Sequence, residues 1–178
     1  MKKLLIIADD FGLSESVNKG IFECCENNIV TGVSVMSTGA AFDDIHYLIE
    51  KYPNIDIGLH FDLISTRLLS DLQINYSPIN LAIRLNFDKK LLEAIRKELI
   101  LQINKLMKIT QIKHIDSHRH IHYIPQIFKI VNDIADELAI ARVRVPCPKI
   151  KFNGLKFMFY RRDFFKFLPF FIFKFFNK

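Results

Sequence analysis

Short apolar runs alternate with helical stripes of apolar residues along most of this chain. The runs that are typical of strands lie at residues 4–8, 29–36, 55–61, 112–118 and 141–145. Such alternation predicts an α/β fold with a parallel sheet and right-handed crossovers. An open doubly wound sheet and a (β/α) barrel both satisfy the pattern, although five strands are too few to close a barrel.

The apolar stripes between these runs predict four helices, over residues 15–27, 41–49, 89–106 and 125–138. Ser14 and Asp88 are expected to cap two of them, and Pro125 suits the first position of a helix. Residues 64–87 show no clean period and are expected to form a long loop of the kind that often contacts a substrate.

Two adjacent carboxylates, Asp9 and Asp10, follow the first apolar run and precede Gly12. They are expected at the carboxyl edge of the sheet, where α/β proteins bind their ligands. Neighbouring carboxylates repel each other unless a cation or a shared proton relieves the repulsion. The alternative is that one Asp caps the next helix and the other is a solvated turn residue.

Four of the six histidines lie within nine residues: His114, His118, His120 and His122. An extended segment would place the last three on one face, because side chains alternate along a strand. Together with His60 and the Asp pair, they suggest a mixed nitrogen and oxygen site. Such a site suits zinc, manganese or cobalt, whereas calcium would need oxygen ligands only.

Each of these residues also has a simpler interpretation. His60 could be a packed histidine at the end of a strand, and the histidine cluster could be a solvated loop. Asp116 is expected to orient a histidine rather than to bind a metal. His46 is expected to be structural or on the surface, and Asp62 to lie in a loop.

Composition argues for a reducing compartment. The three cysteines are odd in number and two are adjacent, and charged residues interrupt the first apolar run before a signal peptide could form. We therefore expect a cytoplasmic protein. The net charge of +6 resides entirely in residues 151–178, so the rest of the chain gives no indication of nucleic-acid binding.

Three segments resemble the YdjC-like carbohydrate deacetylase family, which includes chitooligosaccharide deacetylase: Ala8–Ser14, Gly58–His60 and His114–His122. They occur in the family's order and spacing, and Val30–Ser34 also fits. The likeness extends over about residues 3–146, and the combination is far more specific than any single motif.

The resemblance implies a (β/α) barrel of the polysaccharide-deacetylase type and hydrolysis of the N-acetyl group of an amino sugar or chitooligosaccharide. It implies that Asp10, His60 and His118 bind a divalent metal, taken as magnesium with zinc or another transition metal as alternatives, and that Asp9 is the catalytic base. The remaining residues of the third motif would bind substrate or support the metal ligands: Asp116, His120 and His122.

The resemblance is expected to fail beyond Pro148. Family members are longer, and their last third contributes a His-Pro motif whose histidine serves as the acid for the leaving amine. We therefore expect a deacetylase-like α/β domain over residues 1–150, with a barrel that is incomplete at its C-terminus, and a separate basic tail over residues 151–178. That tail holds 11 of the 17 phenylalanines.

Three roles for the tail stay open. It could be the remnant of the missing strands, or lie on a membrane surface as an interfacial segment, since it is too short and interrupted to span a bilayer. It could also pack into the open barrel edge or against another subunit, which would make a homo-oligomer.

The leading functional hypothesis is a metal-dependent deacetylase with a small carbohydrate substrate and no nucleic-acid partner. The alternative is a truncated, weak or inactive relative that binds sugar or a membrane surface. A phospho-receiver domain would share the acid pair but needs a third-strand Asp and a fifth-strand Lys, and Asp62 is badly placed for the first of these.

Overall fold

The computed structural model of the protein describes residues 4–145, so the predictions for the basic tail lie outside the described residues. Within them the chain forms five strands, β1 Ile7–Phe11, β2 Gly32–Val35, β3 Asp56–Phe61, β4 His114–Ser117 and β5 Arg142–Val143. All neighbouring strands pair in parallel, in the order β1-β2-β3-β4-β5. The predicted parallel α/β fold is confirmed for this part of the chain.

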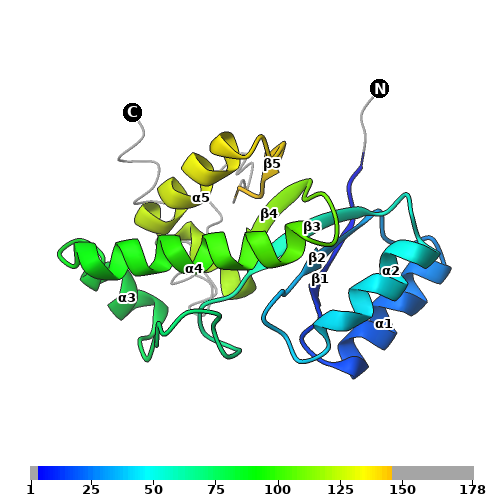
Figure 1. The fold of residues 1–178 in the computed structure, drawn as a ribbon, viewed down its shortest axis with the longest axis horizontal. Helices are drawn as coiled ribbons and strands as arrows, with labels where there is room; N and C mark the ends of the chain where they lie inside the picture. The colour runs from blue at the N-terminus through cyan, green and yellow to red at the C-terminus, as the bar shows by residue number, and fades with distance from the viewer. Residues whose placement is uncertain (1–3, 146–178) are drawn as a thin grey trace, which may run out of the picture.

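Five α-helices connect the strands, α1 Glu15–Glu26, α2 Ile45–Lys51, α3 Pro78–Arg84, α4 Lys89–Met107 and α5 Pro125–Glu137. Two short 3₁₀ segments, η1 Phe42–Asp44 and η2 His118–Tyr123, complete the described chain. The predicted caps are confirmed, because Ser14 accepts from the amide of Val17 and Asp88 from that of Leu91. Figure 1 shows α1 and α2 toward the β1 end of the sheet and α4 and α5 toward the other end.

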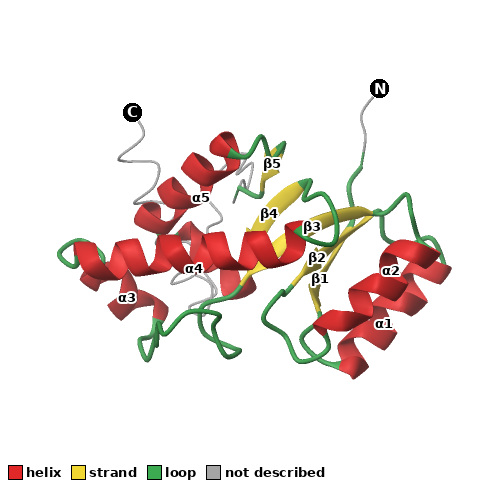
Figure 2. Ribbon diagram, in the orientation of Figure 1, coloured by secondary structure: helices red, strands yellow, loops and turns green. Residues whose placement is uncertain are grey.

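The strand order of the described residues argues against a doubly wound sheet, one of the two architectures that the sequence left open. A doubly wound sheet reverses its winding direction partway along, whereas this sheet adds every strand on the same side of the last. Right-handed crossovers in one direction place all connecting helices on one face, as in a (β/α) barrel. The sheet at the centre of Figure 2 is curved in keeping with this winding. In the described chain β1 and β5 are its two edges, and closure into a barrel stays a prediction.

The two faces of the sheet differ sharply in polarity. Val33, Leu59 and Ile115 face the helices and belong to the apolar core, which also includes Ile95 and Leu99 of α4. Side chains alternate along a strand, so the residues between them face the other way. This inner face is buried and polar: it carries Ser34, His60, His114 and Asp116. The polar inner face is where the candidate site is built.

Two local predictions were wrong. The strand predicted over residues 4–8 begins later, because Leu4, Leu5 and Ile6 are exposed and precede β1. The region predicted as an irregular loop contains α3, which begins at Pro78 and is capped by Ser77. Proline suits the first position of a helix because its missing amide hydrogen has no partner there.

No helix among residues 4–145 combines the length and the apolar composition needed to cross a bilayer.

Gly58 on β3 provides a test of the packing between the sheet's inner-face residues. Replacing it by alanine would place a Cβ 2.1 Å from Nε2 of His114, which is almost fully buried on the adjacent strand. We expect Gly58→Ala to lower the free energy of unfolding by about 1–3 kcal/mol, because overpacking forces neighbouring atoms apart. Urea denaturation measures this change.

The control is Gly20→Ala on the exposed side of α1, where nothing lies within 4 Å of the added Cβ. It should raise stability by up to about 1 kcal/mol, because alanine favours helix over glycine. A Gly58→Ala protein as stable as wild type would contradict the packing described here.

Candidate metal centre

A β-bulge in β1 brings both carboxylates of the Asp pair to the same face. Between the paired positions Ala8–Val33 and Phe11–Val35, β1 has two residues where β2 has only Ser34. Asp10 takes up the extra length in the left-handed region, with φ of 68°. Bulges of this kind redirect side chains, and left-handed backbone is less costly for Asp than for most residues. Adjacent residues of a regular strand would point to opposite faces, so the bulge is what lets Asp9 and Asp10 share a site.

Asp10 lies between the two histidines predicted to join it. Its Oδ1 is 3.0 Å from Nε2 of His60 and 2.7 Å from Nδ1 of His118. The two imidazole rings meet edge to face, with their centroids 5.7 Å apart. His60 is almost fully buried, whereas Asp10 and His118 retain some exposed surface. The site is therefore open to solvent on the side of Asp10.

Asp116 orients the His60 ring through a hydrogen bond. Its Oδ1 lies 2.6 Å from Nδ1 of His60, and a carboxylate in this position can only accept, so Nδ1 carries the proton. Nε2 of the same ring then faces Asp10. This is the arrangement in which a carboxylate fixes the orientation of a metal-binding histidine. The predicted orienting role of Asp116 agrees with this geometry.

Ser34 and His114 extend the chain of hydrogen bonds beneath the site. Ser34 donates to Oδ2 of Asp116 at 2.9 Å, so its oxygen is left to accept from Nε2 of His114, also at 2.9 Å. The His114 ring lies over Gly58, where a side chain would collide with it. His114 is thus a buried histidine of the inner face, two strands away from β2, and it supports the site rather than lining it.

Arg144, just after β5, binds the two remaining carboxylates. Its guanidinium donates to both oxygens of Asp9, at 2.8 and 2.9 Å, and lies 2.9 Å from Oδ2 of Asp116. The planar guanidinium suits such paired contacts with a carboxylate. Asp9 is therefore held beside the Asp10 site by a residue more than 130 positions away in the sequence.

The histidine cluster does not form an extended segment, and the prediction that His118, His120 and His122 share one face is wrong. Arg119 and His120 both adopt left-handed backbone, with φ of 51° and 54°, inside η2. These two residues turn the chain back on itself directly after β4. Only His118 is thereby directed at Asp10.

The other two histidines of the cluster lie in different environments, one exposed and one buried. His120 is exposed and stacks on Tyr123, with the ring centroids 5.0 Å apart. His122 is completely buried: its Nδ1 contacts the hydroxyl of Ser117 and its Nε2 donates to the carbonyl of Arg144 at 2.9 Å. His122 thus fixes the backbone of Arg144, while His120 lies where a bound molecule could reach it.

The charges in the site follow from these contacts. The hydrogen bond from His60, against the effect of burial, lowers the pKa of Asp10 to about 2. Burial opposes a charge on His60, but its bonds to Asp10 and Asp116 outweigh burial and raise its pKa to about 9. Burial lowers the pKa of His122 to about 4 and also lowers that of His114, so both rings are neutral at pH 7.

The donor atoms of the site suit a divalent transition metal ion. Asp10, His60 and His118 each offer one ligand atom, and the three atoms lie within 4.8 Å of one another. One carboxylate and two imidazoles form a set typical of zinc, manganese or iron with open positions. Asp9, His60 and Asp116 lie equally close, but Arg144 already binds the two carboxylates of that group. The first set therefore fits an ion better.

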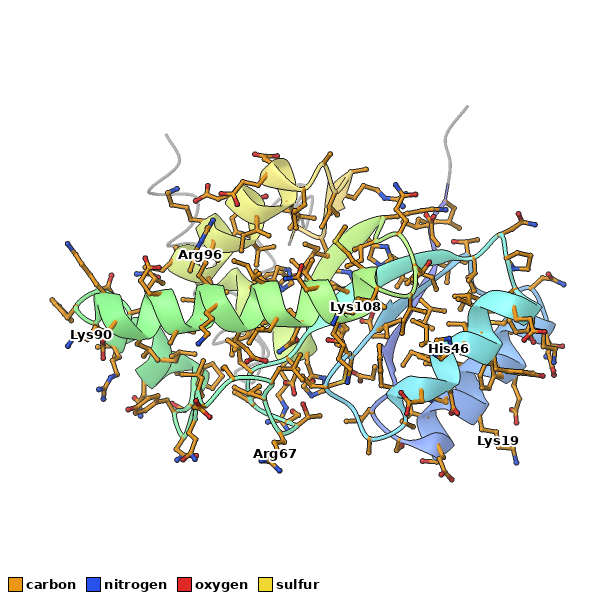
Figure 3. The ribbon with its side chains drawn as sticks, in the orientation of Figure 1. Lys19, His46, Arg67, Lys90, Arg96 and Lys108 are labelled. Carbon is orange, nitrogen blue, oxygen red and sulfur yellow. The ribbon has the colours of Figure 1, made fainter. Side chains whose placement is uncertain are left out.

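Sequence inspection missed Ser34 and Arg144, and it grouped His114 with the candidate ligands instead of giving it a supporting role. Arg144 had a detectable signal, since it lies near the end of the predicted strand at residues 141–145 and therefore at the carboxyl edge with the acids. By contrast, His46 is exposed on α2, away from the site (Figure 3), as the sequence suggested. Asp62 lies in the loop after β3, as predicted, but it is fully buried.

Fold and site together define a singly wound α/β protein with an Asp/His/His group at the carboxyl ends of its strands. A sequence model of the YdjC-like protein family matches residues 3–171, so the chain belongs to this family. The match extends well beyond residue 146, where the resemblance was expected to end. That expectation was wrong.

The crystal structure of a protein from Enterococcus faecalis V583 has the same fold. That protein is called a "putative cellobiose-phosphate cleavage protein", and it is 24% identical to this chain with a TM-score of 0.66. The match covers 84% of this chain and 60% of the other. The chain thus spans about three fifths of the length of this structural relative.

Removal of single ligands tests the metal centre. We expect Asp10→Ala and His118→Ala to abolish binding of Zn²⁺ in isothermal titration calorimetry, because each removes one of three donors. Asp116→Asn should keep the donors but weaken binding by about 10- to 100-fold, the usual cost of losing the partner that orients a metal-binding histidine.

Asp136→Asn, an exposed change on α5, is the matched control and should bind Zn²⁺ like wild type. Circular dichroism verifies that each variant is folded. Unchanged affinity in folded Asp10→Ala protein would rule out the centre as described.

Proposed function

We propose that this chain is a metal-dependent deacetylase that hydrolyses the N-acetyl group of an amino sugar or chitooligosaccharide. The observation that carries the proposal is the grouping of Asp10, His60 and His118 around one point, with Asp9 held beside them. Membership of the YdjC-like family suggests a carbohydrate-processing enzyme, and the name of the structural relative also refers to a saccharide.

The residues divide the work of amide hydrolysis between them. Asp10, His60 and His118 would hold the ion, which when bound supplies positive charge that acidifies water and polarises a carbonyl. Asp9 directly precedes Asp10 in the chain but is not needed as a ligand, so its carboxylate can take a proton from water. Arg144 keeps that carboxylate at a fixed place and orientation through two hydrogen bonds.

The remaining polar groups keep this arrangement rigid. Asp116 and Ser34 fix the ring of His60, and His122 fixes the backbone of Arg144. Asp116, Ser34 and His122 are fully buried, so water does not compete for their hydrogen bonds. His120 and Tyr123 lie stacked next to the site and are suited to contact the sugar ring.

The chemistry of the ligands favours one class of metal ion over another. Magnesium prefers an octahedral shell of oxygens, whereas two of these three donors are imidazole nitrogens. We therefore favour zinc or another transition metal over the magnesium that the family resemblance implies.

A second candidate is a relative that binds a saccharide with little or no turnover. The observation that favours it is the contact of both Asp9 oxygens with Arg144, because the carboxylate that would take the proton from water is already occupied by two hydrogen bonds. Membrane-surface binding by residues 151–178, homo-oligomer formation and a cytoplasmic location stay predictions from the sequence.

An acetate-release assay separates these two functions. We expect the zinc-loaded protein to release acetate from N,N′-diacetylchitobiose, and EDTA to abolish the activity. Asp9→Asn should lower kcat by about 100-fold or more while Zn²⁺ affinity stays unchanged, since general-base catalysis contributes at least that much.

Asp136→Asn again serves as the control with unchanged kcat. A folded, zinc-loaded protein that binds the sugar but releases no acetate would favour the non-catalytic relative. Equal activity of wild type and Asp9→Asn would contradict the role given to Asp9.

A further inference from the structure

We propose that the loop after β3, residues 62–75, forms a binding site for the sugar unit next to the one that reacts. This inference rests on the proposed function, because it assigns the substrate specificity of the same site. It concerns a segment that contributes neither a metal ligand nor a base.

The loop begins directly at the candidate metal centre. Leu63 lines a cavity within the loop and is only three residues after His60. Three residues of extended chain span at most about 11 Å, so the cavity starts within that distance of the metal ligand backbone. A neighbouring unit of an oligosaccharide bound at the metal could therefore reach it.

Asp62 fixes the first half of the loop. Its side chain is completely buried and accepts hydrogen bonds from the amides of Ile64, Ser65 and Thr66 at 2.8–3.2 Å. The hydroxyl of Thr66 also donates to it, at 2.8 Å. An uncompensated buried carboxylate is costly, and these donors are what make its burial tolerable.

Two residues of α4 fix the start and the middle of the loop in the same way. Glu98 is completely buried and accepts from the amides of Leu69 and Ser70, at 3.0 and 2.8 Å. Gln102, also fully buried, donates to Glu98 and to the carbonyl of Asp62, at 2.7 Å each, and accepts from the amide of Asp62. The helix thus supplies hydrogen bonds to the start and the middle of an irregular segment, which holds this part of the loop in one shape before a ligand arrives.

The cavity that this loop encloses has a volume of about 390 Å³. This lies in the range of small-molecule sites. Six of its lining side chains can exchange hydrogen bonds with hydroxyl groups: Thr66, Arg67, Ser70, Asp71, Gln73 and Asn75. The others are aliphatic, and Leu63, Ile64 and Leu68 are among them.

This combination matches an uncharged hexose or N-acetylhexosamine unit better than other ligands. A sugar ring offers many hydroxyl groups at its rim and apolar C–H groups on its faces. One positive and one negative side chain line the cavity, Arg67 and Asp71, so no net charge selects an ionic ligand. We therefore assign the cavity to one unit of a neutral oligosaccharide.

Binding of two ligands of different length tests the assignment. The zinc-loaded full chain carrying Asp9→Asn, to prevent turnover, is titrated with N-acetylglucosamine and with N,N′-diacetylchitobiose, and ligand-observed NMR gives the affinities. We expect the disaccharide to bind at least about tenfold more tightly. Arg67→Ala and Asn75→Ala should each weaken disaccharide binding by about threefold to tenfold, as expected for a lost hydrogen bond, and leave the monosaccharide unaffected.

Lys108→Ala is the matched control, because it removes an exposed positive charge at the C-cap of α4, apart from Arg67 (Figure 3). It should leave both affinities and Zn²⁺ binding unchanged. Equal affinity of the Asp9→Asn protein for the two sugars, or equal weakening of both when Arg67→Ala is added to it, would overturn the assignment.

The outcomes separate this inference from the proposed function. A length preference that depends on Arg67 and Asn75, with no acetate released by the wild-type chain, would support the sugar site and contradict the deacetylase. Acetate release without any length preference would support the deacetylase and contradict the sugar site. No binding of either sugar to folded, zinc-loaded protein would overturn the sugar site whatever the assay shows.

Discussion

The buried carboxylate of Asp116 is the constraint on which the site depends. It has no exposed surface, and it is held by His60 from β3, Ser34 from β2 and Arg144 from the end of β5. Removing a carboxylate from water is expensive unless charged or polar partners surround it. The four strands must therefore keep the register that brings these groups together. A shift by one residue in any of them would turn a partner toward the apolar face.

Irregular backbone occurs at two points where regular backbone would not direct the side chains of the site toward one another. The bulge in β1 places two neighbouring carboxylates on one face, and the left-handed pair Arg119–His120 turns the chain so that His118 meets Asp10. Left-handed backbone costs free energy for residues other than glycine, and proteins retain such strain mainly at functional sites. Asp10, Arg119 and His120 are predicted metal ligands or lie within two residues of one, whereas the other left-handed residues of the described chain apart from glycine, Asn28 and Ala139, follow the ends of helices. This coincidence supports a functional role for the group independently of the family match.

The two faces of the sheet have different roles: one forms the apolar core and the other carries the candidate site. The face toward the helices is aliphatic and forms the core, while the inner face carries a connected network of Ser, His, Asp and Arg side chains. The same separation extends to α4, which offers leucine and isoleucine to the core and Glu98 and Gln102 to the loop after β3. One helix thus stabilises the fold and shapes the region where a substrate would bind.

The sequence by itself determined the parallel α/β class and most of the helices, and its family resemblance singled out Asp10, His60 and His118, which the structure brings close together. Periodicity and strand-end position are local properties, and a parallel sheet collects strand ends at one edge. Only the tertiary structure decided the direction of winding, the separate places of His118, His120 and His122, and the participation of Ser34, His114 and Arg144. Those depend on strand register and on left-handed turns. Contacts between residues far apart in the chain set both, and no local pattern of residues encodes them.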